Sequence, residues 1–202
     1  MRFDSLKYVY LIGIGGIGMS GLARYFKSLG KSVSGYDKTP STLTHEMENE
    51  GIEIHYEDNI SLINKEIIDH ISAIDTLIIY TPAVPSDHNE LVYFSNNKYN
   101  LHKRAEVLGW ITEGHYTVAV AGTHGKTTTS TLVTHILRSS GNDCMAFLGG
   151  VSKNYHTNLL LGKSGNKNKV MVVEADEYDR SFLTLNPDIS VITSIDPDHL
   201  DI

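Results

Sequence analysis

The chain is poor in the residues that mark secreted and nucleic-acid-binding proteins. Its 202 residues include one cysteine, Cys144, so no disulfide can form within the chain, which is typical of a reducing compartment. Lysine and arginine number 17 against 24 acidic residues, giving a formal net charge of −7. A surface that follows a nucleic-acid backbone needs clustered cations, so we expect no nucleic-acid partner. Nucleotides are not excluded, because backbone N–H groups and one or two cations can hold their phosphates.

Long hydrophobic runs are also lacking. The apolar segment 8–19 is too short to span a bilayer, and it passes into a helical pattern without a small-residue cleavage site. We therefore interpret it as a buried strand and turn, and expect a cytoplasmic protein with no membrane partner.

The first half of the chain alternates strand and helix signals. Strands are predicted at 8–12, 32–36, 52–54 and 76–80, and helices at 19–29, 43–50 and 104–112. Strands separated by helices indicate parallel pairing, so the predicted fold class is α/β with a Rossmann-like, doubly wound sheet.

The pattern then restarts. A strand at 117–121, a loop at 122–126 and a helix at 127–139 precede two further strands, 170–174 and 189–194. We predict a first domain over residues 1–112, and over residues 113–202 the N-terminal part of a second, incomplete P-loop α/β domain.

A glycine-rich segment follows the first strand. Gly13, Gly15 and Gly18 fit G-x-G-x-x-G, and Asp37 stands at the end of the next strand, where dinucleotide folds carry a ribose-binding acid. Taken alone, this pattern favours an NAD-dependent oxidoreductase. However, the geometry specifies only a diphosphate at a helix N-terminus, which any nucleotide diphosphate satisfies.

A second phosphate-binding pattern lies at 121–129, with the sequence AGTHGKTTT. It predicts that Lys126 reaches the β- and γ-phosphates of ATP and that the Thr127 hydroxyl binds Mg²⁺. The match departs from the general motif at Val120, where a glycine is usual. The predicted ATP-binding residues are Gly122, Thr123, His124, Gly125, Lys126, Thr127 and Thr128.

Acidic residues follow both later strands. Glu174 begins the segment EADE, and DPDH ends at His199. Because the carboxyl ends of parallel strands meet at one sheet edge, these side chains are candidate metal ligands near the phosphates.

Together, these segments resemble the Mur ligases of bacterial cell-wall synthesis. The resemblance rests on GIGGIGMSGLA (13–23), YTPAVP (80–85), RAEVLG (104–109), GTHGKTTTS (122–130), EADEYDRSF (174–182) and DPDHLD (196–201). The first of these narrows it to the alanine-adding and the murein-peptide-recycling branches, of which we favour the former.

The resemblance implies site residues in both domains. In the first domain it implies a UDP-sugar site with the diphosphate over Gly15, Gly16, Ile17 and Gly18, and with Asp37, His55, Thr81 and Ala83 nearby. In the second domain it implies a catalytic set of Lys126, Glu174 and His199, metal ligands Thr127, Glu174 and His199, and contact between Asn158 and the incoming substrate.

The implied reaction is ATP-dependent ligation in peptidoglycan precursor synthesis, with ATP and Mg²⁺. The lactyl carboxylate of UDP-N-acetylmuramate attacks the γ-phosphorus of ATP, giving an acyl phosphate that the amine of L-alanine then opens, releasing phosphate. Family members continue past this segment into a C-terminal amino-acid-binding domain, so we expect this chain to be a fragment without ligase turnover. A non-catalytic nucleotide-binding module remains an alternative beside the oxidoreductase.

Overall fold

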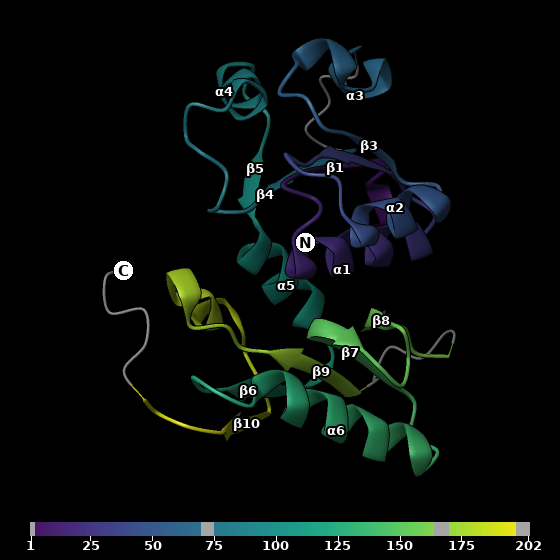
Figure 1. The fold of residues 1–202 in the computed structure, drawn as a ribbon, viewed down its shortest axis with the longest axis vertical. Helices are drawn as coiled ribbons and strands as arrows, with labels where there is room; N and C mark the ends of the chain where they lie inside the picture. Colours follow the sequence, from purple (N-terminus) through teal and green to yellow (C-terminus); the bar gives the residue numbers. More distant parts are fainter. Residues whose placement is uncertain (1–2, 70–74, 164–169, 197–202) are drawn as a thin grey trace. The chain divides into compact units, whose positions relative to one another are not determined.

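The computed structural model describes residues 3–69, 75–163 and 170–196. By their internal contacts, the residues form two compact units, Met1–Arg104 and Ala105–Ile202 (Figure 1). Each unit is built around its own five-stranded sheet. Within the described residues, no helix is long and apolar enough to cross a membrane.

The first unit is an α/β layer structure with a fully parallel sheet in the order β3-β2-β1-β4-β5. Its strands are β1 (Tyr8–Ile12), β2 (Ser32–Tyr36), β3 (Glu53–His55), β4 (Thr76–Tyr80) and β5 (Leu101–Lys103). The α-helices and 3₁₀ segments are η1 (Phe3–Ser5), α1 (Ile17–Ser28), α2 (Thr42–Asn49), η2 (Ile60–Leu62), α3 (Lys65–Asp69) and α4 (Asn89–Asn96). The predicted α/β class and parallel first sheet are confirmed.

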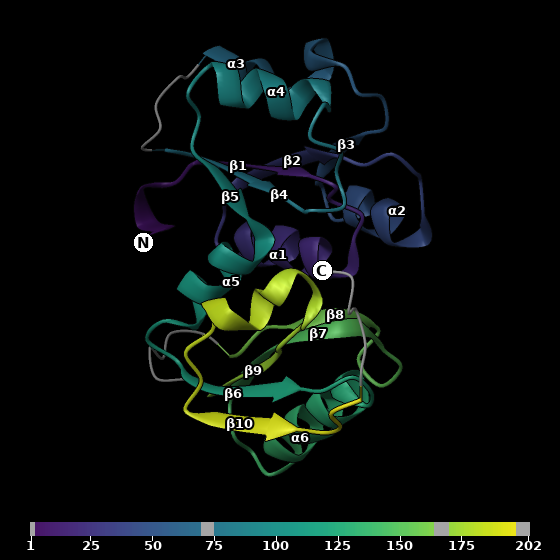
Figure 2. The same cartoon turned by 90° about the vertical axis from the view of Figure 1, so that its left-hand side faces the viewer.

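Apolar runs place the sheet between two helical layers. Val9, Tyr10, Leu11 and Ile12 of β1 are each 0% exposed, as expected for a central parallel strand covered on both faces. Figure 2 shows α1 and α2 on one face and α3 and α4 on the other. A core cluster on the α3/α4 side includes Tyr10, Ile67 and Phe94.

Helix α2 begins with a capping box. The Ser41 hydroxyl accepts a hydrogen bond from the Thr44 backbone N–H at 3.1 Å, and the Thr44 hydroxyl accepts one from the Ser41 N–H at 2.8 Å. Thr44 is 0% exposed, so this cap is part of the interior. The two bonds satisfy N–H groups that the first helical turn leaves unpaired.

The second unit has a mixed sheet in the order β10-β6-β9-β7-β8, in which only the β7–β8 pairing is antiparallel. Its strands are β6 (Tyr116–Ala121), β7 (Cys144–Ser152), β8 (Thr157–Leu160), β9 (Val170–Glu174) and β10 (Ile189–Ile192). The helices are α5 (Arg104–Thr112), α6 (Lys126–Ser139) and η3 (Tyr178–Thr184).

Helix α6 covers one face of this second sheet. Val133 and Leu137 of α6 pack against a buried cluster that contains Val118 of β6 and Val172 of β9. Figures 1 and 2 show α5 and η3 on the opposite side of the sheet. The Thr184 hydroxyl donates to the Ala105 carbonyl at 2.8 Å and joins η3 to α5.

The predicted division at 112/113 stays a prediction. The contact-based units meet at Arg104 and Ala105, so α5 is counted with the second unit except for its first residue. The second unit as a working P-loop ATPase domain also stays a prediction.

Candidate functional site

The loop after β6 adopts a conformation that requires glycine at two positions. Gly122 has φ 126° and Gly125 has φ 82°, both in the region that side chains with a Cβ rarely adopt. A Cβ on Gly122 would also overlap the Thr193 hydroxyl and the Ser194 backbone. Gly125 is the N-cap of α6, so the loop leads directly into a helix N-terminus, which favours anions.

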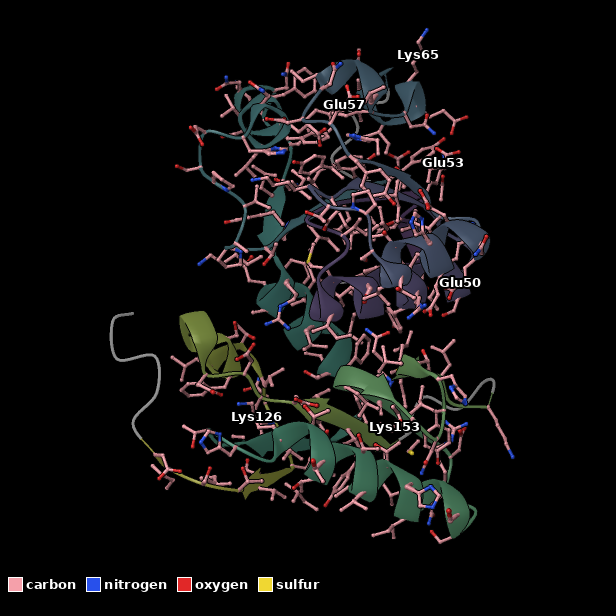
Figure 3. All side chains as sticks on the ribbon, viewed as in Figure 1. Glu50, Glu53, Glu57, Lys65, Lys126 and Lys153 are labelled. Atoms are coloured by element: carbon pink, nitrogen blue, oxygen red, sulfur yellow. The ribbon has the colours of Figure 1, made fainter. Side chains whose placement is uncertain are left out.

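Lys126 is the first residue of α6 (Figure 3). Its Nζ donates to the Gly122 carbonyl at 2.6 Å and to both carboxylate oxygens of Glu177 at 2.8 Å each. The Lys126 and Glu177 side chains are 16% and 25% exposed. The ammonium is therefore held over the loop, largely shielded from water.

Glu174 lies at the end of β9 and collects three donors. Its carboxylate accepts hydrogen bonds from the Thr127 hydroxyl at 3.1 Å, the Ser130 hydroxyl at 3.0 Å and the Gly149 N–H at 2.6 Å. The predicted residues Lys126, Thr127 and Glu174 are thus brought together at one sheet edge. Ser130 and Gly149 are partners that the motifs did not single out.

The remaining loop residues contact the segment after β10. The Thr123 and Ser194 hydroxyls are 2.8 Å apart, and the His124 N–H donates to the Ser194 hydroxyl at 3.0 Å. Thr128 lies exposed in the first turn of α6. An apolar cavity of about 420 Å³ lies beside the loop, with Gly122, Glu177 and Phe182 among its lining residues.

The predicted metal site is described only in part. Thr127 Oγ1 and Glu174 Oε2 are 3.1 Å apart, and such oxygens suit Mg²⁺. The third predicted ligand, His199, lies outside the described residues. In the part of the chain that the structure describes, no group of three or more His, Cys, Asp or Glu side chains is placed to hold a metal ion.

The first glycine loop is held by Asp37. The Asp37 carboxylate accepts hydrogen bonds from the Gly15 N–H at 2.7 Å and the Thr39 N–H at 3.0 Å. Gly16 is the N-cap of α1, whose first turn has no acidic residue and includes Ile17 and Gly18. The Asp37 carboxylate therefore takes one of the loop N–H groups that the diphosphate prediction invokes.

Side chains from other segments come close to the glycines of this loop, among them Arg104 and Thr44. A Cβ on Gly18 would lie 2.6 Å from Nη1 of Arg104, and one on Gly15 would lie 2.9 Å from Cγ2 of Thr44. Arg104 therefore brings a cation to the start of α1. The motif-based prediction missed this residue as a site candidate, although it begins the segment RAEVLG.

A cavity of about 260 Å³ adjoins the loop. Its lining residues include the predicted Gly16, Asp37, Thr81 and Ala83, together with Tyr36 and His88. His88 was not predicted. The centroid of its ring lies 4.4 Å from the centroid of the Tyr36 ring. Both ring nitrogens of His88 are buried, and neither makes a hydrogen bond to a described residue. The Asp58 carboxylate is close by, with its Oδ1 3.4 Å from His88 Nε2.

Two predicted substrate residues lie away from that cavity lining. His55, on β3, has Nε2 2.8 Å from the Tyr10 hydroxyl and Nδ1 2.9 Å from the Glu57 carbonyl. Burial lowers the pKa of His55, which favours the neutral imidazole. Asn158 lies on β8 in the second unit and is 1% exposed.

Glu90 of α4 is a carboxyl group buried at 0% exposure. It accepts a hydrogen bond from the Tyr10 hydroxyl at 2.7 Å, and its Oε1 is 3.3 Å from His55 Nε2. Burial raises the pKa of Glu90 to about 7. No sequence motif marks this group.

Comparison with known proteins identifies the family. The model of the Mur ligase family, catalytic domain, matches residues 8–116, which is more than half of the chain. The chain belongs to the Mur ligase family. A model of the Mur ligase middle domain matches residues 120–202, which contain the Gly122–Gly125 loop and Glu174.

Two curated relatives of this Mur ligase chain carry the same name. It is 57% identical to a UDP-N-acetylmuramate–L-alanine ligase of Flavobacterium johnsoniae over 202 residues, which are 100% of this chain and 43% of that protein. A protein of the same name from Porphyromonas gingivalis is 57% identical over 98% of this chain and 42% of its own length. The chain thus spans less than half the length of these relatives.

Solved Mur ligase structures share the fold. A UDP-N-acetylmuramate–alanine ligase from Thermotoga maritima gives a TM-score of 0.83 at 30% identity, covering 96% of this chain and 43% of that one. A UDP-N-acetylmuramate:L-alanyl-γ-D-glutamyl-meso-diaminopimelate ligase from Neisseria meningitides gives 0.86 at 25% identity, covering 98% and 63%.

Proposed function

We propose that this chain carries the sugar-nucleotide-binding and phosphate-binding segments of a UDP-N-acetylmuramate–L-alanine ligase. The observation that carries the proposal is the cluster at the carboxyl ends of β6 and β9, where Lys126, Thr127 and Glu174 converge on one glycine loop. Its support from outside the structure is 57% identity, over the whole chain, to a relative with that name.

In this proposal the second unit is the N-terminal part of an ATP-binding domain. Lys126 donates its N–H groups to the β- and γ-phosphates, and the helix start of α6 adds backbone donors. The Thr127 hydroxyl and the Glu174 carboxylate would hold Mg²⁺, since their oxygens already lie 3.1 Å apart. Bound Mg²⁺ supplies charge neutralisation at the transferring phosphoryl group.

The first unit is the proposed site for UDP-N-acetylmuramate. The start of α1 with Gly16, Ile17 and Gly18 would hold the diphosphate, and the Arg104 guanidinium beside Gly18 would neutralise part of its charge. The cavity that contains Asp37, Thr81 and Ala83 would take the nucleoside. His55 would act through the cavity wall, since its ring centroid lies 5.6 Å from that of Tyr36, which lines the cavity.

The reaction that these parts serve is the formation of an amide bond. The lactyl carboxylate displaces ADP at the γ-phosphorus, and the L-alanine amine then displaces phosphate at the activated carbonyl. This chain contributes by positioning the reactants. It also contributes the Lys126 ammonium group, which stabilises the negative charge that develops on the transferring phosphoryl group. Use of ATP favours the cytoplasm as the location.

A peptide-adding ligase is the second candidate. It is favoured by the TM-score of 0.86 to the Neisseria meningitides enzyme, whose name includes a tripeptide. The chain is 25% identical to that enzyme and 57% identical to the alanine ligase of Flavobacterium johnsoniae. This difference in identity favours the alanine-adding function over the peptide-adding one. A nicotinamide oxidoreductase loses its support, because membership of the Mur ligase family accounts for the first glycine loop.

Calorimetric titration of the 202-residue chain with UDP-N-acetylmuramate, Mg-ATP and NAD tests the proposal. We expect the sugar nucleotide to bind and NAD not to bind. Lys126→Ala is the matched variant, which should weaken Mg-ATP binding about tenfold or more and leave sugar-nucleotide binding unchanged. Binding of NAD without binding of UDP-N-acetylmuramate would contradict the proposal.

A further inference from the structure

Glu174, the last residue of β9, and Glu177, three residues later, are bound in different ways. Glu174 accepts from Thr127, Ser130 and Gly149, so three groups on two segments fix it. Glu177 uses both carboxylate oxygens on Lys126. Lys126 is the only hydrogen-bonding partner of the Glu177 side chain among the side chains that the structure describes, those of residues 3–68, 75–163, 170–177 and 181–196. Glu174 is therefore an anchored group, and Glu177 can leave by breaking contact with one residue.

Glu177 also takes the donors that a phosphate needs. An ammonium group has three N–H donors, and those of Lys126 face the Gly122 carbonyl and the two Glu177 oxygens. A phosphate that binds Lys126 must therefore replace one of these three contacts, and two of the three are to Glu177. Glu177 also lines the 420 Å³ cavity beside the loop, which gives its side chain space to move into.

We propose that Glu177 is a competing anion that occupies Lys126 and must be displaced when the loop binds a polyphosphate. The inference rests on the proposed phosphate-binding function of the loop. It assigns Glu177 a role in setting affinity and selectivity, separate from the metal-binding role proposed for Glu174.

A selectivity follows from the charge of Glu177. After displacement, the carboxylate remains near the phosphate chain, where two negative groups repel. This repulsion is larger for a metal-free polyphosphate than for one whose charge Mg²⁺ partly neutralises. Glu177 thus favours the Mg²⁺ complex of a nucleotide over the free anion.

The test compares the full 202-residue chain with Glu177→Gln and Glu113→Gln. The second variant removes the same charge from an exposed residue at the opposite end of β6. Each protein is titrated calorimetrically with sodium tripolyphosphate in EDTA and with Mg-ATP. Circular dichroism confirms that each is folded.

We expect Glu177→Gln to bind tripolyphosphate roughly two- to fivefold more tightly, the value of removing one partly exposed ion pair. The gain should be smaller for Mg-ATP, and Glu113→Gln should match the wild type. Unchanged or weaker tripolyphosphate binding in Glu177→Gln would overturn the inference. Weaker Mg-ATP binding would instead assign Glu177 to the metal.

A second readout does not depend on phosphate binding. Lys126 should react faster with an amine-acylating reagent in Glu177→Gln than in the wild type, measured by peptide mass spectrometry. Equal rates would show that Glu177 does not hold Lys126. If no protein bound either probe, the proposed function of the loop and this inference would both fail; binding without a gain in Glu177→Gln would defeat the inference alone.

Discussion

At the scale of single residues, glycines with positive φ differ in what surrounds them. Gly122 has φ 126° and backbone atoms of Ser194 where a Cβ would stand. Gly114 has φ 83° and no atom within 4 Å of that position. Gly122 is therefore required both by its positive φ and by the close packing of Ser194, whereas Gly114 is required only by its positive φ.

This difference predicts unequal losses on substitution. Gly114→Ala should lower the free energy of unfolding by about 1 kcal/mol, the cost of a left-handed alanine. Gly122→Ala should lower it by about 3 kcal/mol, because the loop must also move away from Ser194. Urea denaturation of both variants measures the two losses. Equal values would show that the close approach to Ser194 has no energetic consequence.

Sequence patterns identified Lys126, Thr127 and Glu174 because each stands at a fixed position in a recognised motif. They did not identify Glu177 or Arg104 as site candidates, although both lie in the quoted segments. The partner of Glu177 is 51 residues away in the chain, and that pairing depends on how η3 follows β9. Such a contact has no local signature.

At the scale of elements, helix α4 buries its only acidic residue. Glutamate side chains are almost never fully buried without a partner, yet Glu90 is 0% exposed, with the Tyr10 hydroxyl as its partner inside. Helix α4 was not predicted. Strand β7 was also missed, since its buried run is interrupted by Gly149 and Gly150 and its partner β8 is antiparallel.

The buried carboxyl of α4 predicts a pH dependence. The pKa of Glu90 is raised from 4.5 to about 7, so between these values the folded chain binds a proton that the unfolded chain releases. The protonated Glu90 carboxyl therefore stabilises the fold below pH 4.5, and this stabilisation is lost as the pH rises through about 7. The free energy of unfolding should fall by about 3 kcal/mol in total over this range.

Glu90→Gln removes this titration and keeps an oxygen for the Tyr10 hydroxyl. The variant should gain about 3 kcal/mol relative to the wild type between pH 4.5 and pH 8, measured by urea denaturation at both pH values. His55 and His88, whose pKa values burial lowers, give the opposite slope and are present in both proteins. Parallel pH profiles would contradict the assignment to Glu90.

At the scale of the whole molecule, the chain is two α/β units with separate phosphate-site candidates. The order of elements in the first unit was largely predictable, because buried strands and a glycine turn repeat in a regular alternation. The boundary was less predictable, because α5 begins at the residue directly after β5, with no loop to mark a division. The matched family regions leave residues 117–119 between them, whereas contacts divide the chain at Arg104 and Ala105.

Two fragments distinguish these boundaries. Residues 105–202 keep the hydrogen bond from Thr184 to Ala105, and residues 113–202 lose it. Loss of this bond and of the packing of Gly109 on Thr184 should cost at least about 1 kcal/mol. Thermal unfolding followed by circular dichroism should give a higher midpoint for the longer fragment. Equal midpoints would support the division at 112/113.

The capping box of α2 has a bearing on protein engineering. Consensus redesign would replace Thr44 by glutamate, the residue usually favoured at the third helical position. Here the Thr44 methyl and the Asp37 carboxylate both lie within 3 Å of the point where a Cβ on Gly15 would stand. The redesign would bring a second negative charge and extra bulk to the proposed diphosphate site. An automated stabilisation protocol should therefore hold Thr44 fixed, even though it stands in an ordinary helix cap.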